Sequence, residues 1–137
     1  IGNRVSPIGS FTDPEYAQVG PTETKARKTH DVVVARVSFD SMTRTIIDGR
    51  TRGFLKLIVD RPTRKLLACH VVGERAVDIT QTAAVAIAAG MRVDDLAQIP
   101  LSFPTYAGIL GRAAATAARL PNLTVSWPAE IQETLRS

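Results

Sequence analysis

Short apolar runs in the first half of the chain predict β-strands. The runs are rich in valine, leucine and isoleucine, which favour extended backbone on a half-buried surface. They are Asp31–Phe39, Gly53–Asp60 and Lys65–Val72. Only four residues, Arg61-Pro62-Thr63-Arg64, separate the last two runs, so an antiparallel hairpin is the simplest connection. Two shorter extended pieces, Pro7–Thr12 and Tyr16–Val19, flank Asp13-Pro14, because a residue before proline avoids the α region.

Helical periodicity surrounds these strands. Pro21–Lys28 is expected to form a helix that is capped by Thr22 and ends near His30. After Gly73 the spacing of apolar residues changes from two to about 3.6, which predicts two longer helices. One helix face collects Ile79, Ala83, Ala86, Ile87 and Gly90, and a second helix over Thr105–Arg119 collects Tyr106, Ile109, Leu110, Ala113 and Ala117.

Shorter elements join the strands and helices. Asp94 and Asp95 suit the first turn of a short helix through Ala97, because carboxylates are favoured at the positive helix end. Ser41–Ile47 is ambiguous between a turn and a short helix, and Asp48-Gly49 is a turn signal. Strands in the middle with helices in blocks indicate an α+β fold, in which an antiparallel sheet is flanked by helices.

The length of the chain and its first residues indicate a single domain and argue against an exported or membrane protein. A length of 137 residues suits one domain with a real core. The first residue is Ile1, and no apolar signal-peptide stretch follows it, which indicates a fragment boundary and no export. The apolar stretch Ala83–Ala89 is far shorter than the roughly 18 to 20 residues of a membrane helix. We therefore expect a cytoplasmic protein without membrane association.

The net charge of +4 is concentrated in the middle of the chain. Residues 25–65 hold 11 of the 17 Lys and Arg but only 4 of the 13 Asp and Glu. These charges alternate with apolar residues, which favours a solvated surface over a nucleic-acid site. The alternative is a free-standing basic module whose phosphate-contacting face would consist of Lys25, Arg36, Arg44, Arg50, Arg52, Lys56, Arg64 and Lys65.

Residue types with catalytic chemistry are sparse. Cys69 is the single cysteine and lies in an apolar run, where a buried thiol behaves as a small hydrophobe. With only His30 and His70 as imidazoles, no zinc-ligand spacing exists, and structural roles are expected for both. No G-x-G-x-x-G follows a strand, so the chain is not expected to hold FAD or NAD(P) by itself.

Five ordered motifs resemble a known family. They are Phe-Thr-Asp-Pro-Glu-Tyr-Ala-Gln-Val-Gly-Pro-Thr-Glu at residues 11–23, Gly53–Leu57, Ala68–Gly73 followed by Ala76 and Asp78, Val93–Ala97, and Phe103-Pro104-Thr105. Together they resemble the C-terminal interface (dimerisation) domain of the FAD-dependent pyridine nucleotide-disulfide oxidoreductases, which include lipoamide dehydrogenase, glutathione reductase, mercuric reductase and the soluble transhydrogenase.

The resemblance implies an α+β interface domain over residues 1–120, with residues 121–137 as an extension of unknown role. It implies that FAD and NAD(P) are bound by upstream domains of the parent chain, and that the parent is a homodimer. The loop Phe103-Pro104-Thr105 would approach the flavin region of the other subunit. Tyr106 and Ile109 would join that loop in the two-fold contact.

One motif departs from the family pattern. The disulfide reductases of the family carry the motif His-Pro-Thr-x-x-Glu. In that motif the Glu orients the His, and the His acts as acid and base for a thiol pair in the partner subunit. Here these two positions are Phe103 and Gly108, which carry no proton and no carboxylate. The implied parent is therefore a flavin-dependent NAD(P)H oxidoreductase whose acceptor is not a lipoamide- or glutathione-type disulfide. The chain also lacks the adjacent cysteines with which mercuric reductases end, and a redox-inactive pseudo-enzyme is a further alternative.

Overall fold

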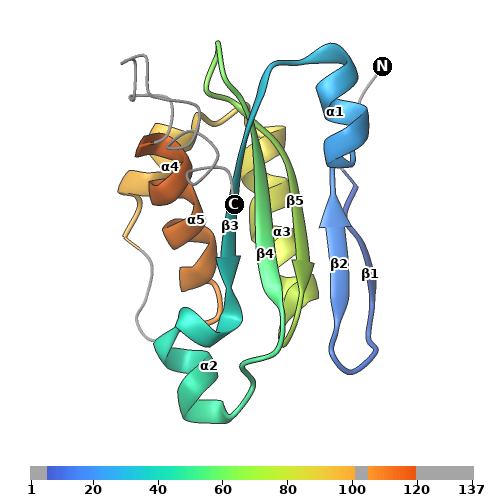
Figure 1. The fold of residues 1–137 in the computed structure, drawn as a ribbon, viewed down its shortest axis with the longest axis vertical. Coiled ribbons are helices and arrows are strands. Elements are labelled where there is room, and N and C mark those ends of the chain that lie inside the picture. The colour runs from blue at the N-terminus through green and yellow to red at the C-terminus, as the bar shows by residue number, and fades with distance from the viewer. Residues whose placement is uncertain (1–5, 101–104, 120–137) are drawn as a thin grey trace, which may run out of the picture.

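The strands form one five-stranded antiparallel sheet in the order β1-β2-β5-β4-β3 (Figure 1). The computed structural model describes residues 6–100 and 105–119. β4 and β5 form the predicted hairpin, while β3 pairs with β4 and β2 pairs with β5. The strand bounds are β1 Ile8–Ser10, β2 Tyr16–Val19, β3 Val32–Ser38, β4 Phe54–Asp60 and β5 Leu66–Val72.

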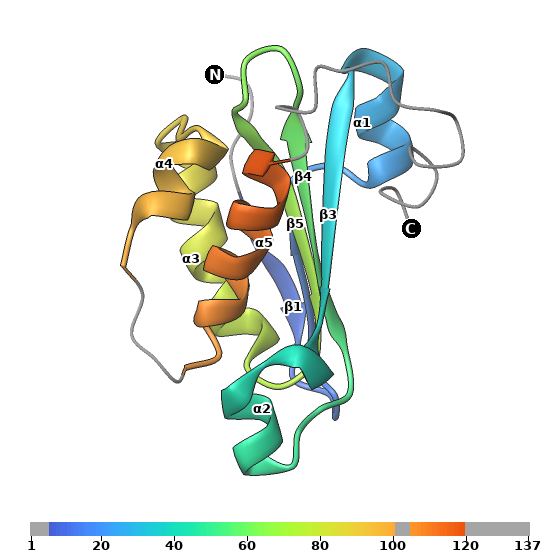
Figure 2. The same cartoon turned by 60° about the vertical axis from the view of Figure 1, so that its left-hand side comes forward.

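The helices lie on both faces of the sheet and at one end of it. α3 and α5 cover one face, with α4 beside α5, and α1 lies against the other face (Figure 2). A 3₁₀ turn, η1, leads into α2 beyond the end of β3 (Figure 1). The bounds are α1 Glu23–Thr29, η1 Phe39–Ser41, α2 Thr43–Asp48, α3 Ala76–Ala88, α4 Val93–Gln98 and α5 Gly108–Arg119.

Each face of the sheet has its own core because side chains alternate along the strands. The larger core contains Leu55, Leu57 and Val71, all fully buried beneath α3 and α5. The smaller core lies under α1, where Ala26, Val32, Ile58 and Ala68 pack together. β4 contributes to both cores, which explains why its sequence lacks a simple apolar–polar alternation.

Most of the predicted elements are confirmed. The Thr22 hydroxyl accepts a hydrogen bond from the backbone N–H of Lys25 at 3.2 Å, and α1 ends at His30 as expected. The ambiguous stretch 41–47 contains the end of η1 and most of α2, with Met42 between them. The last helix begins at Gly108 instead of Thr105, because the Thr105 hydroxyl caps it by accepting from the Gly108 N–H at 3.2 Å. No helix within the described residues is long and apolar enough to cross a membrane.

Two glycines allow close packing at the end of the sheet next to α2. Gly73 follows β5 with φ 144°, and a Cβ there would meet the Phe39 ring at 2.4 Å. Gly53 precedes β4 with φ 123°, and its Cβ would meet the Val72 carbonyl oxygen at 1.9 Å. Only glycine fits both sites. Residues 121–137, predicted as an extension, lie outside the described residues.

Candidate functional site

Of the residues that the resemblance places near a partner flavin, those that the structure describes lie at the start of α5. Thr105 and Tyr106 precede the helix and Gly108 opens it, while Phe103 and Pro104 lie outside the described residues. A Cβ added at Gly108 would meet Met42 Cε and Thr105 Oγ1 at 3.7 Å, which is ordinary van der Waals contact. Position 108 therefore has no carboxylate, and a Cβ there would fit without a clash.

Tyr106 is bound to α2. Its hydroxyl donates to Asp48 Oδ2 at 2.7 Å, and the same oxygen accepts from Arg44 Nε at 3.0 Å. The Arg44 guanidinium also lies 5.9 Å from the centroid of the Tyr106 ring. Burial and the hydrogen bond to Asp48 raise the pKa of Tyr106 to about 12. The hydrogen bonds from Tyr106 and Arg44 lower the pKa of Asp48. Tyr106 is thus a fixed neutral donor near pH 7 and not a proton shuttle.

Asp48 and Arg44 were not predicted as part of this site. The sequence identified Asp48 only as a turn signal and Arg44 only as one member of the basic stretch. The two are four residues apart, a spacing that favours an ion pair on one helix face. That spacing was the available signal, but it does not reveal contact with Tyr106, which is 58 residues further along the chain.

The prediction for Ile109 needs correction. Its side chain is 1% exposed and belongs to the larger core. The apolar face of α5, including Leu110 and Ala113, packs against the chain's own β3 and β4. Periodicity located this face correctly. It was assigned to the wrong partner, because an apolar stripe on a helix does not reveal whether it meets a sheet or a second subunit.

The histidines and the cysteine have the expected structural surroundings. His70 Nε2 lies 3.0 Å from the Pro21 carbonyl oxygen and links β5 to the segment before α1. His30 Nδ1 lies 2.8 Å from Thr29 Oγ1 at the end of α1. Cys69 is buried, and burial raises the pKa of its thiol to about 12. Among the residues that the structure describes, no group of His, Cys, Asp and Glu could hold a metal ion.

The proposed basic face is divided among separate contacts. Arg64 pairs with Asp94, and Lys56 pairs with Glu23 on the opposite side of the sheet. Arg36 lies over the Phe54 ring at 4.0 Å. These partners neutralise or cover the charges, so the geometry favours ordinary surface over a phosphate-contacting face.

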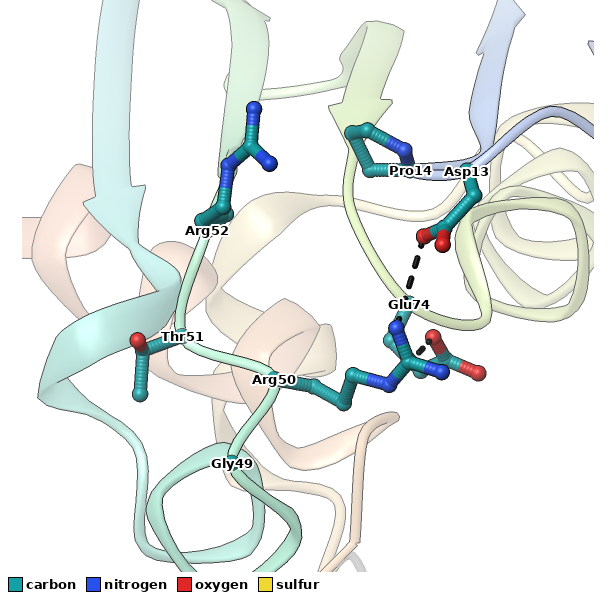
Figure 3. Close-up of a pocket in the computed structure, with 7 residues that line it drawn as sticks. All are labelled: Asp13, Pro14, Gly49, Arg50, Thr51, Arg52 and Glu74. Carbon is teal, nitrogen blue, oxygen red and sulfur yellow. Dashed lines mark hydrogen bonds and ion pairs between the residues drawn. The ribbon is translucent and has the colours of Figure 1, made fainter.

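A shallow hollow near the end of β5 holds two more of these arginines (Figure 3). Arg50 lies between Asp13 at 3.4 Å and Glu74 at 3.5 Å, and Arg52 points away from both carboxylates. Two arginines and two carboxylates leave no charge preference for an anion. The hollow therefore carries no argument for a phosphate ligand.

The strand-to-helix junctions do not fit a dinucleotide. A dinucleotide-binding turn needs glycines that let backbone N–H groups approach a pyrophosphate. Gly20 lies between β2 and α1, and a Cβ there would meet the Leu67 carbonyl oxygen at 2.3 Å. Gly73 lies between β5 and α3, and the Phe39 ring fills the space that a side chain at Gly73 would need. Both glycines serve packing within this domain, so neither of these two junctions has the open glycine turn of a dinucleotide site.

Comparison with known proteins identifies relatives. The model for the dimerisation domain of pyridine nucleotide-disulphide oxidoreductases matches residues 6–114. The chain is 37% identical to mercuric reductase from Lysinibacillus sphaericus over 113 residues and 34% identical to dihydrolipoyl dehydrogenase from Geobacillus stearothermophilus over 116 residues. These matches cover 82% and 84% of this chain but only 21% and 25% of the relatives.

The fold is also found in a solved structure. The HOCl-induced flavoprotein disulfide reductase RclA from Escherichia coli is similar, with a TM-score of 0.79 and 24% sequence identity. The match covers 82% of this chain and 26% of RclA. The chain thus spans about a quarter or less of each of these three proteins.

Proposed function

The chain belongs to the dimerisation-domain family of the pyridine nucleotide-disulphide oxidoreductases, and we propose that it is the C-terminal interface domain of a longer FAD-dependent NAD(P)H oxidoreductase. The match over residues 6–114 carries this proposal. In the parent enzyme, upstream domains bind FAD and NAD(P), and this domain joins two subunits. Residues 103–105 approach the flavin of the other subunit.

The parent enzyme transfers hydride from NAD(P)H to FAD and then reduces an acceptor that needs no proton from a histidine at position 103. The support is chemical. Phe103 replaces the histidine of the family motif and Gly108 replaces the glutamate, so neither position can carry a proton or orient a base. A quinone, a second nucleotide or a metal species fits this requirement.

The cofactor assignment is tested by comparing two proteins. The full-length parent should purify yellow, and NAD(P)H should bleach its FAD. The isolated chain should purify colourless and oxidise no NAD(P)H. Stoichiometric flavin retained by the isolated chain through gel filtration, or a full-length protein without flavin, would overturn the proposal.

The acceptor assignment is tested by steady-state kinetics on the full-length enzyme. Turnover with lipoamide or glutathione disulfide should be about 10²- to 10⁴-fold below that of an enzyme with a working acid–base pair, which is the usual scale of this loss. Efficient disulfide turnover would exclude the assignment, unless another residue were shown to supply the proton.

For the two-fold contact, the outward face of α3 replaces the buried Ile109. Val85 is 63% exposed in the last turn of this 13-residue helix, and its exposed neighbours on α3 include Ala88. Small neighbours allow two symmetry-related helices to approach closely. In the full-length enzyme, Val85→Glu should convert dimers to monomers in light scattering, whereas Ile47→Glu, at a position 65% exposed on α2, should not. Monomers for Ile47→Glu and dimers for Val85→Glu would instead place the two-fold contact on α2.

A further inference from the structure

α2 is held against the start of α5 by side-chain bonds, with little core packing. Of its six residues only Thr45 is buried. Ile46 and Ile47 are 59% and 65% exposed, so apolar burial does not determine where this helix lies. Two polar links join α2 and the turn before it to α5.

The first link joins the last turn of α2 to the residue before α5. Asp48 accepts from Tyr106 at 2.7 Å and from Arg44 at 3.0 Å, with both donors on the same carboxylate oxygen. Arg44 holds the carboxylate from within the helix, since the two residues are four apart. Hydrogen bonds to an ionised acceptor are stronger than bonds between neutral groups. Tyr106 is therefore tied to a carboxylate whose direction is already fixed.

The second link joins the second turn of α5 to the turn before α2. Arg112 Nη1 donates to the Ser41 carbonyl oxygen at 2.6 Å and lies 3.6 Å from Met42 Sδ. The two links hold residues 41–48 and 106–112 as one unit. Thr105 lies directly before this unit and caps α5. Thr105 thus adjoins the part of α5 that these two links connect to α2 and to the turn before it.

We propose that Asp48 and Tyr106 are positioning residues, which fix the Thr105 end of α5 against the flavin site of the partner subunit. This inference rests on the proposed function, in which that end approaches the partner's FAD. The two residues touch no reacting atom. Their role is to hold a chain segment in one direction, and α2 supplies the Asp48 carboxylate for that hydrogen bond.

The test uses the full-length enzyme with Asp48→Asn, Tyr106→Phe and the double variant. The matched control is Arg27→Gln, which breaks another exposed ion pair of the same spacing, with Glu23 on α1 across the sheet. Iodide quenching of FAD fluorescence reports access of solvent to the flavin. The rate of flavin reduction by NAD(P)H, FAD content and dimer mass are measured on the same samples.

Both single variants should raise the iodide quenching constant by about twofold or more, because a weakened link increases locally opened states. The double variant should add nothing further, because both changes break one bond. Flavin reduction by NAD(P)H, FAD content and dimer mass should stay unchanged, as should all readouts of Arg27→Gln. Unchanged quenching in flavin-loaded dimers of both variants would overturn the inference. A wild-type protein without FAD, or a monomeric one, would overturn the proposed function and this inference with it.

Discussion

Replacing Arg64 by alanine should lower the free energy of unfolding by about 2–3 kcal/mol, and replacing it by glycine should cost about 1 kcal/mol less. Arg64 lies between β4 and β5, and its side chain is 15% exposed. Its Nε and Nη2 donate to the two oxygens of Asp94 at 2.6 Å each, and Nη2 also donates to the Ala118 carbonyl oxygen at 2.8 Å. One side chain thus ties the hairpin to α4 and to the end of α5.

The magnitude follows from partial burial and from the backbone angle. Exposed ion pairs contribute about 0–1 kcal/mol, and breaking a fully buried pair costs about 3–5 kcal/mol, so a bidentate pair with 15% and 31% exposure falls between these limits. Arg64 also has φ 64°, a left-handed angle that costs a residue with a Cβ about 1–2 kcal/mol. Alanine keeps this strain and loses the bonds. Glycine loses the bonds but relieves the strain.

The assay is urea denaturation followed by far-ultraviolet circular dichroism, with Asp94→Ala and the double variant completing a cycle. The interaction energy between Arg64 and Asp94 should be about 1–2 kcal/mol, since contacting residues couple on that scale. A loss below about 0.5 kcal/mol for Arg64→Ala, within the range of ordinary surface substitutions, would refute the reasoning. So would a glycine variant less stable than the alanine variant.

Four other outcomes are expected. Thr80→Val should leave the free energy of unfolding unchanged or raise it by about 1 kcal/mol, because Thr80 Oγ1 is buried without a hydrogen-bond partner. A decrease of more than about 1 kcal/mol in the same denaturation assay would contradict this reasoning. Ile109→Ala should cost about 2–5 kcal/mol, as truncation of a core residue does. Cys69 should resist alkylation at pH 8 until denaturant is added, because the pKa of its thiol is about 12. Since the folded-state pKa of Tyr106 is raised to about 12 from about 10, its stabilising contribution should be complete below pH 10 and lost as pH rises through 12; an ultraviolet titration should show earlier ionisation in Asp48→Asn.

Local patterns predicted the strands and helices well, because each element carries its own period or cap. The apolar runs form β3, β4 and β5, and the short proline-containing link forms the hairpin turn. Thr22 was recognised as a cap because its side chain bonds a backbone N–H only three residues away. The start of α5 was misplaced by three residues, since the Thr105 cap was read as helix.

Contacts between distant residues escaped prediction. The N–H of Val77 at the start of α3 lies 3.3 Å from the Glu15 carboxylate, 62 residues earlier in the chain. The Tyr106–Asp48 bond spans 58 residues, and the Arg64–Asp94 pair spans 30. No periodicity encodes such pairs. The family resemblance identified the loop before α5 but not the helix that supports it, because the support uses ordinary surface residue types.

Packing at the end of the sheet next to α2 connects a local sequence pattern with a contact between distant residues. Gly73 has no side chain, so the Phe39 ring can occupy the space above it. The buried ring fixes η1, and the Thr45 hydroxyl donates to the carbonyl oxygens of Phe39 and Met42, which sets the direction of α2. α2 then places Asp48 for Tyr106. A local feature of the sequence, one glycine after β5, therefore helps to place the carboxylate on α2 that Tyr106 binds just before α5.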